Sequence, residues 1–189
     1  MNNIDTSSWK EFKLCELFDK IQVEKINGKA GDFPDEPIND YIIPLLTCST
    51  SNQGFSRYAK REQCPTILKN VISVSANGTG IAFYQSNEFA VLQDSYALKL
   101  KYEDLTESTG LYLTTLINKL LVEGKYDWTN KSGWNNIKDL SIKLPVKEIE
   151  EIDWNYMEKY IRAMEKVVIA DVVKYKDQVI ETTKRIVEK

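Results

Sequence analysis

The last 44 residues of the chain, after Pro145, contain neither glycine nor proline. These two residues most often end a helix, so their absence predicts one continuous helix from about Asp153 to about Val187. At about 1.5 Å per residue such a helix is roughly 50 Å long, which is more than a domain of the preceding residues needs for its own packing. We therefore expect an α+β fold, in which a mixed sheet-and-helix domain over residues 1–148 precedes a long helix over residues 149–189.

The predicted helix carries an apolar stripe along most of its length. The stripe advances in steps of three and four residues and repeats every 11 residues, which indicates a nearly straight helix pairing. Further apolar residues around Val167 and Val173 lie beside the stripe, so the helix needs cover from more than one direction. We expect a partner helix; the alternative is a helix packed only on its own domain. The stripe comprises Ile161, Met164, Val168, Val172, Tyr175, Val179, Thr183 and Ile186.

Strand patterns dominate the first hundred residues. Apolar or alternating runs predict strands over residues 41–47, 71–76, 88–92 and 96–101, and another over residues 140–144. In the second of these strands Ile72 and Val74 face one way and Ser73 and Ser75 the other. Asn77-Gly78 follows that strand and predicts a tight two-residue hairpin turn.

An amphipathic helix is predicted over residues 111–123. Ser108 is the expected N-cap, and Gly124 stands where a C-terminal glycine is expected. Residues 125–135 are polar and aromatic, which is typical of a loop. The apolar stripe of this helix comprises Leu113, Leu116, Ile117, Leu120 and Leu121.

The chain contains no histidine, which excludes Ser-His-Asp and Cys-His catalysis and any His-ligated zinc site within it. Gly78-Thr79-Gly80 lacks the third glycine of a dinucleotide-binding loop, so a hairpin turn is the better interpretation. Asp35, Glu123 and Lys125 match the letters of a metal-dependent nuclease motif, but their separation is large and Glu123 fits a helix end better. We expect no catalytic residue, no metal site and no cofactor bound by this chain.

The three cysteines, Cys15, Cys48 and Cys64, form neither a CxxC pair nor a metal cluster. This usage is typical of a reduced cytoplasmic protein. The first residues show no secretory signal pattern, and no apolar run is long enough to span a bilayer. We therefore expect a cytoplasmic protein without membrane association.

Two polar loops combine side chains that suit nucleic-acid recognition. The first covers residues 47–58 and continues to Lys60; the second covers residues 125–135. Asn, Gln and Arg can hydrogen-bond base edges in pairs, and Ser, Thr and Lys can reach phosphates. The alternative is two ordinary solvated loops with Trp128 and Trp134 as core anchors, and the formal net charge of −3 argues against a strong non-specific DNA binder. The candidate DNA-contacting residues are Ser49, Thr50, Asn52, Gln53, Arg57, Tyr58, Lys60, Lys125, Thr129, Asn130 and Lys131.

Four segments occur in an order that resembles one known family. They are residues 9–18, residues 43–55, residues 71–85, and residues 142–146 immediately before the long helix. Their sequences are WKEFKLCELF, IPLLT leading to QGF, VISVSANGTG followed by FYQ, and IKLPV. Together they resemble a specificity (S) subunit of type I restriction–modification systems, in a half-length form, over nearly the whole chain.

The resemblance implies a non-catalytic, sequence-specific DNA-recognition subunit. Residues up to about Val146 would form one target recognition domain, and the helix would pair with another helix and dock methyltransferase subunits. S-adenosylmethionine would then bind to the partner methyltransferase, and a restriction nuclease could belong to the same system. Family members usually carry two recognition domains and two helices, so two copies of this chain would rebuild that arrangement with antiparallel helices and read a split palindrome.

The length of the helix sets the expected spacing of the two half-sites. Helices of roughly 50 Å would place the two domains about one to one and a half DNA turns apart. Two other functions stay open from the residues alone. One is a helix-paired protein–protein adaptor that does not bind DNA, and the other is the metal-dependent nuclease that would use Asp35 and Glu123.

Overall fold

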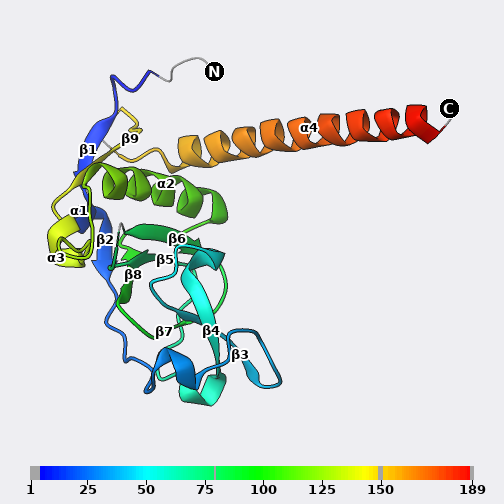
Figure 1. Cartoon of the computed structure of the whole chain (residues 1–189). Helices are drawn as coiled ribbons and strands as arrows, with labels where there is room; N and C mark the ends of the chain where they lie inside the picture. Colours follow the sequence, from blue (N-terminus) through cyan, green and yellow to red (C-terminus); the bar gives the residue numbers. More distant parts are fainter. Residues whose placement is uncertain (1–4, 79, 149–150, 188–189) are drawn as a thin grey trace.

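The computed structural model describes residues 5–78, 80–148 and 151–187, with side chains up to Thr183. Its central sheet has four antiparallel strands in the order β2-β8-β5-β6. They are β2 (Phe18–Lys20), β8 (Ser95–Leu100), β5 (Val71–Ser75) and β6 (Ile81–Gln85). Helix α2 (Glu107–Glu123) covers this sheet (Figure 1).

The main hydrophobic core lies between α2 and the four-stranded sheet. Ile72 and Val74 of β5 and Leu113 and Ile117 of α2 are completely buried there. The expected apolar stripe of α2 is confirmed, since Leu121 is also buried and the other stripe residues, Leu116 and Leu120, pack against the same core.

A second sheet of three strands lies at the end of the domain away from α2. Strand β3 (Tyr41–Leu46) pairs antiparallel with β4 (Phe55–Lys60) and parallel with β7 (Ala90–Val91). Strands β1 (Lys10–Lys13) and β9 (Ser141–Leu144) pair separately, next to the short helices α1 (Leu14–Leu17) and α3 (Trp134–Ile137). Three 3-10 turns complete the described elements, at Ala30–Asp32, Asn52–Gly54 and Arg61–Gln63.

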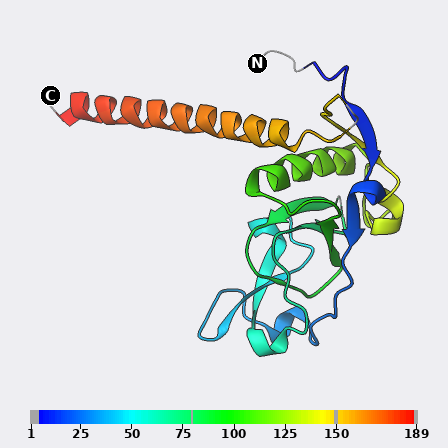
Figure 2. The ribbon, with the colours of Figure 1, turned by 180° about the vertical axis from the view of Figure 1, so that it is seen from behind.

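The long helix α4 (Trp154–Val187) confirms the predicted C-terminal helix. Its first turns pack on the domain: Met157 is fully buried, the Tyr160 ring lies 5.8 Å from that of Tyr112, and the Tyr156 ring lies 5.7 Å from that of Trp9. The rest of the helix projects away from the domain, as both views of the ribbon show (Figures 1 and 2). No helix in the described part of the chain is long and apolar enough to cross a membrane.

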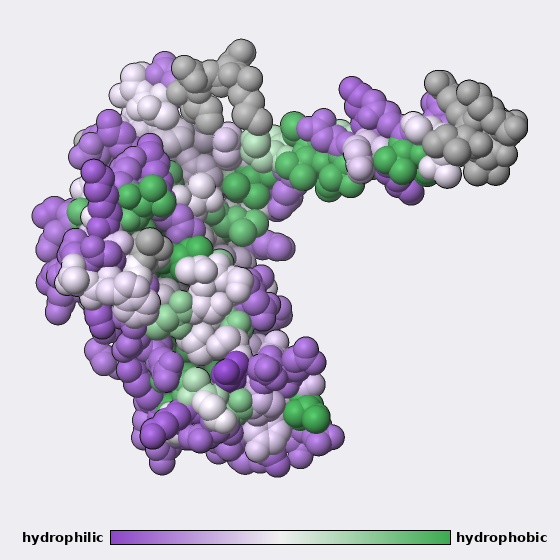
Figure 3. Space-filling view, viewed as in Figure 1, coloured by the Kyte–Doolittle hydropathy of each residue, from purple (hydrophilic) through white to green (hydrophobic). Residues whose placement is uncertain are grey.

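The domain covers only the first part of the apolar stripe. Ile161 and Met164 are half-buried, whereas Val168, Val172 and Tyr175 are 57%, 61% and 69% exposed. Figure 3 shows this apolar surface on the projecting helix. Packing on its own domain therefore leaves most of the stripe uncovered. Val179 is also largely exposed, and the side chain of Ile186 lies outside the described residues.

The β5–β6 hairpin forms as predicted, but its turn is longer than expected. Residues 76–80 connect the strands, so the predicted two-residue turn at Asn77-Gly78 is wrong. Ser73 and Ser75, on the face opposite Ile72 and Val74, are buried as well: they are 0% and 4% exposed. The reason is that β5 lies between β8 and β6 and both faces of the sheet are covered.

The ends of α2 also differ from the prediction. The N-cap is Thr106, whose hydroxyl accepts the backbone N–H of Thr109 at 3.2 Å, so Ser108 lies inside the first turn. Gly124 does end the helix, but it keeps a helical φ of −71°, and the left-handed residue is Lys125 at φ 49°. Glycine is required at 124 because the Tyr126 ring occupies the place of a side chain.

Two smaller predictions were only partly right. The strand expected over residues 88–92 is reduced to the two residues of β7. The loop expected over residues 125–135 ends in the first turn of α3, which begins at Trp134.

Candidate nucleic-acid interface

The connection between β5 and β6 lies between the two polar loops. Strand β5 ends at Ser75, opposite Ser95 of β8. Asn77, just beyond that end, donates from its side-chain amide to the Asp94 carboxylate at 2.5 Å and to Cys48 Sγ at 3.5 Å. Since Cys48 begins the first polar loop, this hydrogen bond ties the first loop to the hairpin.

The second polar loop packs against the same hairpin. Ser132 is completely buried, and its hydroxyl donates to the Ser75 carbonyl at 3.0 Å. Its own carbonyl accepts the Tyr96 hydroxyl at 2.9 Å. Gly80 has φ +69°, and a Cβ there would lie 2.6 Å from the Ser132 hydroxyl. The start of the first loop and the end of the second therefore meet at the Ser75 end of the four-stranded sheet. We call the surface formed by the two loops and this end of the sheet the loop face (residues 47–54, 76–78, 80, 92–95 and 125–133).

The tip of the first loop has an unusual backbone. Asn52, Gln53 and Gly54 follow one another with φ of 46°, 53° and 88°, and such left-handed geometry is uncommon for residues other than glycine. The Gly54 carbonyl accepts from both the backbone N–H and the hydroxyl of Thr47, at 2.9 and 3.2 Å. The turn is thus fixed from within the domain, and the side chains of Asn52 and Gln53 are exposed on it.

The remaining candidates of the first loop fall into two groups. Thr50 is exposed and Ser49 is half-buried near the tip, whereas Arg57, Tyr58 and Lys60 lie along β4. The Arg57 guanidinium donates to the carbonyls of Ala30 and Ser56, at 2.8 and 2.6 Å. It is therefore already engaged in holding the domain together.

Lys60 lies at the far end of β4 from the loop face. It is paired with Tyr41, at the opposite end of the β3–β4 pair from Leu46 and Phe55. Its ammonium lies 3.8 Å from the Asp40 carboxylate and 5.2 Å from the centre of the Tyr41 ring. The structure therefore does not bring Lys60 together with the tip residues.

An aspartate orders the tip of the second loop. Asp127 Oδ1 accepts three hydrogen bonds of 2.7 Å, from the backbone and hydroxyl of Thr129 and from the backbone of Asn130. These bonds, led by that of the Thr129 hydroxyl, lower the pKa of the Asp127 carboxyl below its ordinary value. All four candidates of this loop are exposed: Lys125, Thr129, Asn130 and Lys131.

Sequence reasoning missed a basic hollow beside the loop face. A cavity of about 310 Å³ is lined by residues that include Lys20, Gln22, Lys25 and Asp94. The Lys20 ammonium lies 5.5 Å from the centre of the Tyr96 ring. Nothing in the sequence distinguishes these lysines, because the segment after β2 comes near Asp94 only through sheet pairing.

The two tryptophans of the second loop behave differently. Trp134 lines the basic hollow and packs on the main core, with its ring 6.5 Å from that of Tyr96. Trp128 is 69% exposed. The core-anchor interpretation therefore holds for Trp134 and is wrong for Trp128.

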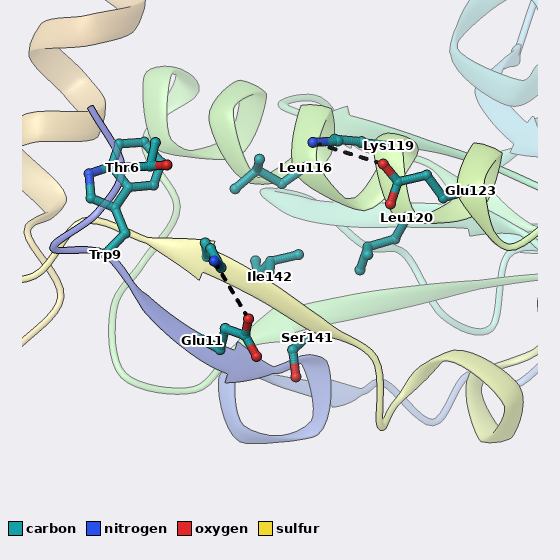
Figure 4. Close-up of a pocket in the computed structure, with 10 residues that line it drawn as sticks. Thr6, Trp9, Glu11, Leu116, Lys119, Leu120, Glu123, Ser141 and Ile142 are labelled. Atoms are coloured by element: carbon teal, nitrogen blue, oxygen red, sulfur yellow. Dashed lines mark ion pairs between the residues drawn. The ribbon is translucent and has the colours of Figure 1, made fainter. Parts of the chain in front are cut away.

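The structure does not favour a nuclease centre. Glu123 lines an open hollow of about 310 Å³ between α2 and β1–β9, where it pairs with Lys119 at 3.9 Å (Figure 4). Glu11 and Lys143 form a second exposed ion pair there, and Asp35 is not among the residues that line it. Among the described residues no three Asp, Glu, Cys or His side chains gather in a way that could hold a metal ion.

The loop face therefore combines exposed amide and hydroxyl groups with nearby lysines on an ordered scaffold. Comparison with known proteins identifies the family of the chain. Residues 6–175 match the sequence model described as type I restriction modification DNA specificity domain. The chain belongs to this family. The resemblance stated from the four segments is thus confirmed, and its α+β fold with a long helix agrees with the solved structures.

The relatives of the specificity domain are considerably longer than this chain. One is the specificity subunit S.BcgI of a type II restriction enzyme from Heyndrickxia coagulans, which is 25% identical over 173 residues, 89% of this chain and 47% of the relative. The S subunit of a type I system from M. genitalium aligns with a TM-score of 0.55 and 16% identity, over 91% of this chain and 42% of that one. The HsdS subunit from Thermoanaerobacter tengcongensis gives a TM-score of 0.56 and 13% identity, over 89% of this chain and 40% of that one. This chain therefore spans less than half the length of each relative.

Proposed function

We propose that this specificity domain reads a short DNA sequence with its loop face and directs a methyltransferase, and in some assemblies a nuclease, to it. The observation that carries the proposal is the convergence of both polar loops on the β5–β6 connection of a DNA specificity domain. The domain itself would contribute no catalytic group. S-adenosylmethionine would bind to the partner methyltransferase, and the work would take place in the cytoplasm.

The acidic balance of the chain does not oppose this function. Two acidic side chains at the loop face, Asp94 and Asp127, accept hydrogen bonds from neighbouring residues of the same face. Lys20, Lys25, Lys125 and Lys131 are exposed at or beside it. A local excess of lysine would attract phosphates even though the net charge is −3.

We further propose that residues 1–148 act as the recognition domain and that two copies pair through α4. The helix stripe reads the same in both directions, with steps of 3, 4, 4, 3, 4, 4 and 3 residues. A reversed copy of the helix can therefore place an apolar or small residue opposite every stripe position, which favours an antiparallel homodimer. The opposing pairs would be Ile161 with Ile186, Met164 with Thr183, Val168 with Val179, and Val172 with Tyr175.

This register predicts the separation of the two domains. The two-fold axis would pass midway between Val172 and Tyr175, some 13 or 14 residues beyond Tyr160, where α4 packs on the domain. At about 1.5 Å per residue the two Tyr160 positions would then lie roughly 40 Å apart along the helices. Since one turn of DNA is about 34 Å, the two half-sites would be centred a little more than one turn apart.

DNA recognition is tested by selection from a library of random double-stranded DNA, with the full chain and with its assembled methyltransferase complex. We expect a split palindrome to be enriched. Gln53→Ala and Lys131→Ala should weaken binding to the enriched DNA, the first at particular bases and the second for all sequences alike. Lys143→Ala, on β9, is the matched control and should leave binding unchanged. If no sequence is enriched by either preparation, DNA recognition is wrong.

The helix register is tested by disulfide cross-linking in a chain whose three native cysteines are replaced by serine. Val168→Cys combined with Val179→Cys should give a covalent dimer in air, because these positions face each other in the proposed register. The control combines Val168→Cys with Tyr175→Cys, which is four residues out of register and should cross-link poorly. Equal cross-linking of both variants, or a mass of one chain by light scattering, would exclude the register.

A further inference from the structure

A buried glutamine joins the first polar loop to the four-stranded sheet. Gln85, the last residue of β6, is 1% exposed. Its side-chain nitrogen donates to the backbone carbonyl of Gln53 and to the Ser73 hydroxyl, both at 2.8 Å. A primary amide nitrogen has two hydrogens, so both donors of Gln85 are used.

The bond to Gln53 connects two separate sheets. Gln53 lies in the turn between β3 and β4 of the three-stranded sheet, whereas Gln85 belongs to β6 of the four-stranded sheet. Gly54, next to Gln53, fits closely in the same place, because a Cβ there would lie 2.8 Å from Leu46 Cδ1 and 3.6 Å from Phe83 Cδ2. The turn is therefore seated between the sheets. Thr47 holds it from the three-stranded sheet, and the Gln85 amide is its polar contact from the four-stranded sheet.

The turn needs such a contact because its backbone is unfavourable. Asn52 and Gln53 are left-handed at φ 46° and 53°, a geometry that residues other than glycine hold only when their surroundings impose it. A buried donor that points at the backbone carbonyl of Gln53 stabilises this conformation relative to others, because any other conformation would leave a buried amide hydrogen without an acceptor. Together with the bonds from Thr47 to Gly54, Gln85 then sets the direction in which the exposed Asn52 and Gln53 side chains leave the domain.

We propose that Gln85 is a positioning residue for sequence recognition: it does not touch DNA, and it holds the Asn52-Gln53 turn in the orientation that reads bases. The proposal rests on the proposed function of the loop face. It explains why a polar side chain occupies a buried place at the end of β6. Base discrimination needs side chains held within narrow limits, whereas attraction to phosphates tolerates a loose loop.

The test compares Gln85→Met with the wild-type chain in the methyltransferase complex. Methionine keeps the approximate length of the side chain and removes both donors. We expect affinity for the selected DNA to fall about tenfold, the order of one lost base contact, while affinity for random DNA of the same length changes less than twofold. Hydrogen exchange of the peptides that cover residues 51–54 should become faster in the variant. Ser73→Ala is the matched control: it removes the second acceptor and retains the bond to Gln53, so discrimination should persist.

Each outcome decides the matter. Unchanged discrimination and unchanged exchange in Gln85→Met would overturn the proposal. Equal losses for selected and random DNA would also overturn it, because they would mean a general structural role. A wild-type complex without sequence preference would refute the proposed function itself, and the exchange measurement would then still show whether Gln85 orders the turn.

Discussion

Asn118 of α2 caps the open edge of the four-stranded sheet, and we expect its replacement by alanine to lower the free energy of unfolding. Strand β6 is the edge strand, so its outward backbone groups have no neighbouring strand. Asn118 replaces that neighbour: its Oδ1 accepts the Ala82 N–H at 2.7 Å and its Nδ2 donates to the Ala82 carbonyl at 2.9 Å. Ala82 is completely buried, so both groups lose their partner in Asn118→Ala.

The expected cost follows from these two hydrogen bonds. A buried polar group left without a partner costs about 1–3 kcal/mol, and relaxation or entry of water reduces the sum for two adjacent groups to about 2–5 kcal/mol. The better helix propensity of alanine returns about 0.5 kcal/mol. The free energy of unfolding should therefore fall by roughly 2–4 kcal/mol, which lowers the thermal midpoint by about 5–15 °C for a chain of this size.

Urea denaturation followed by circular dichroism, at one fixed protein concentration, measures this loss. Thr115→Ala is the control on the same helix, because Thr115 is exposed and its hydroxyl donates to the carbonyl of Leu111 in its own helix. It should change stability by less than about 0.5 kcal/mol. If Asn118→Ala costs no more than this control, the capping bonds contribute nothing and the reasoning is refuted. The result bears on function, since the β5–β6 hairpin carries both the centre of the loop face and Gln85.

Three further perturbations test the loop face and the helix. Gly80→Ala and Gly78→Ala both place alanine at a left-handed φ near +68°, but of these two positions only Gly80 has a buried hydroxyl, that of Ser132, where the new Cβ would lie. Thermal denaturation should therefore show that the Gly80→Ala variant is less stable than the Gly78→Ala variant by about 1–3 kcal/mol. Tyr175→Glu puts like charges into the proposed helix pair and should reduce the mass measured by light scattering to one chain, whereas Lys176→Glu, outside the stripe, should leave the dimer intact. Asp127→Ala unties the second loop and should lower affinity for selected DNA without shifting the thermal midpoint. Because the pKa of Asp127 is depressed in the folded chain, the stabilisation of the second loop by its carboxylate is complete above the ordinary aspartate pKa and is lost as pH falls through the lowered value. DNA titrations of the wild type at pH 7 and under acid conditions should therefore show, at acid pH, the same loss of affinity that Asp127→Ala causes at pH 7.

The elements that the sequence predicted well are those whose causes are local. Helix α4 begins within one residue of the predicted start, because only the absence of glycine and proline and the continuing periodicity were needed. The burial of Ser73 and Ser75 depends instead on what covers the second face of β5, and no pattern within the strand contains that information. The same holds for Gly124, where the Tyr126 ring fills the place of a side chain.

The candidate site was predicted in part for the same reason. Composition selected two loops, and the structure brings the start of the first and the end of the second to the same end of the four-stranded sheet. Two candidate residues do not lie free at this surface: Arg57 donates to backbone carbonyls inside the domain, and Lys60 lies at the far end of β4. Gln85 was missed because a glutamine at the end of a strand normally indicates solvent exposure. Its burial depends on Gln53, which is 32 residues away in the chain.

In the proposed assembly, the residues that would read DNA and the helix that would set the spacing of the half-sites are held in the domain by different contacts. The loop face is anchored on Ser75 and Ser132, at one end of the four-stranded sheet. Helix α4 is held by other contacts, chiefly those of Tyr156 and Tyr160 with Trp9 and with Tyr112 of α2. Helix α2 lies between the two regions, with its inner residues in the core and its outer face against α4. In the proposed dimer, substitutions in the loops would therefore change the bases that are read without disturbing the helix pair, while the register of α4 would set the distance between half-sites independently of their sequence.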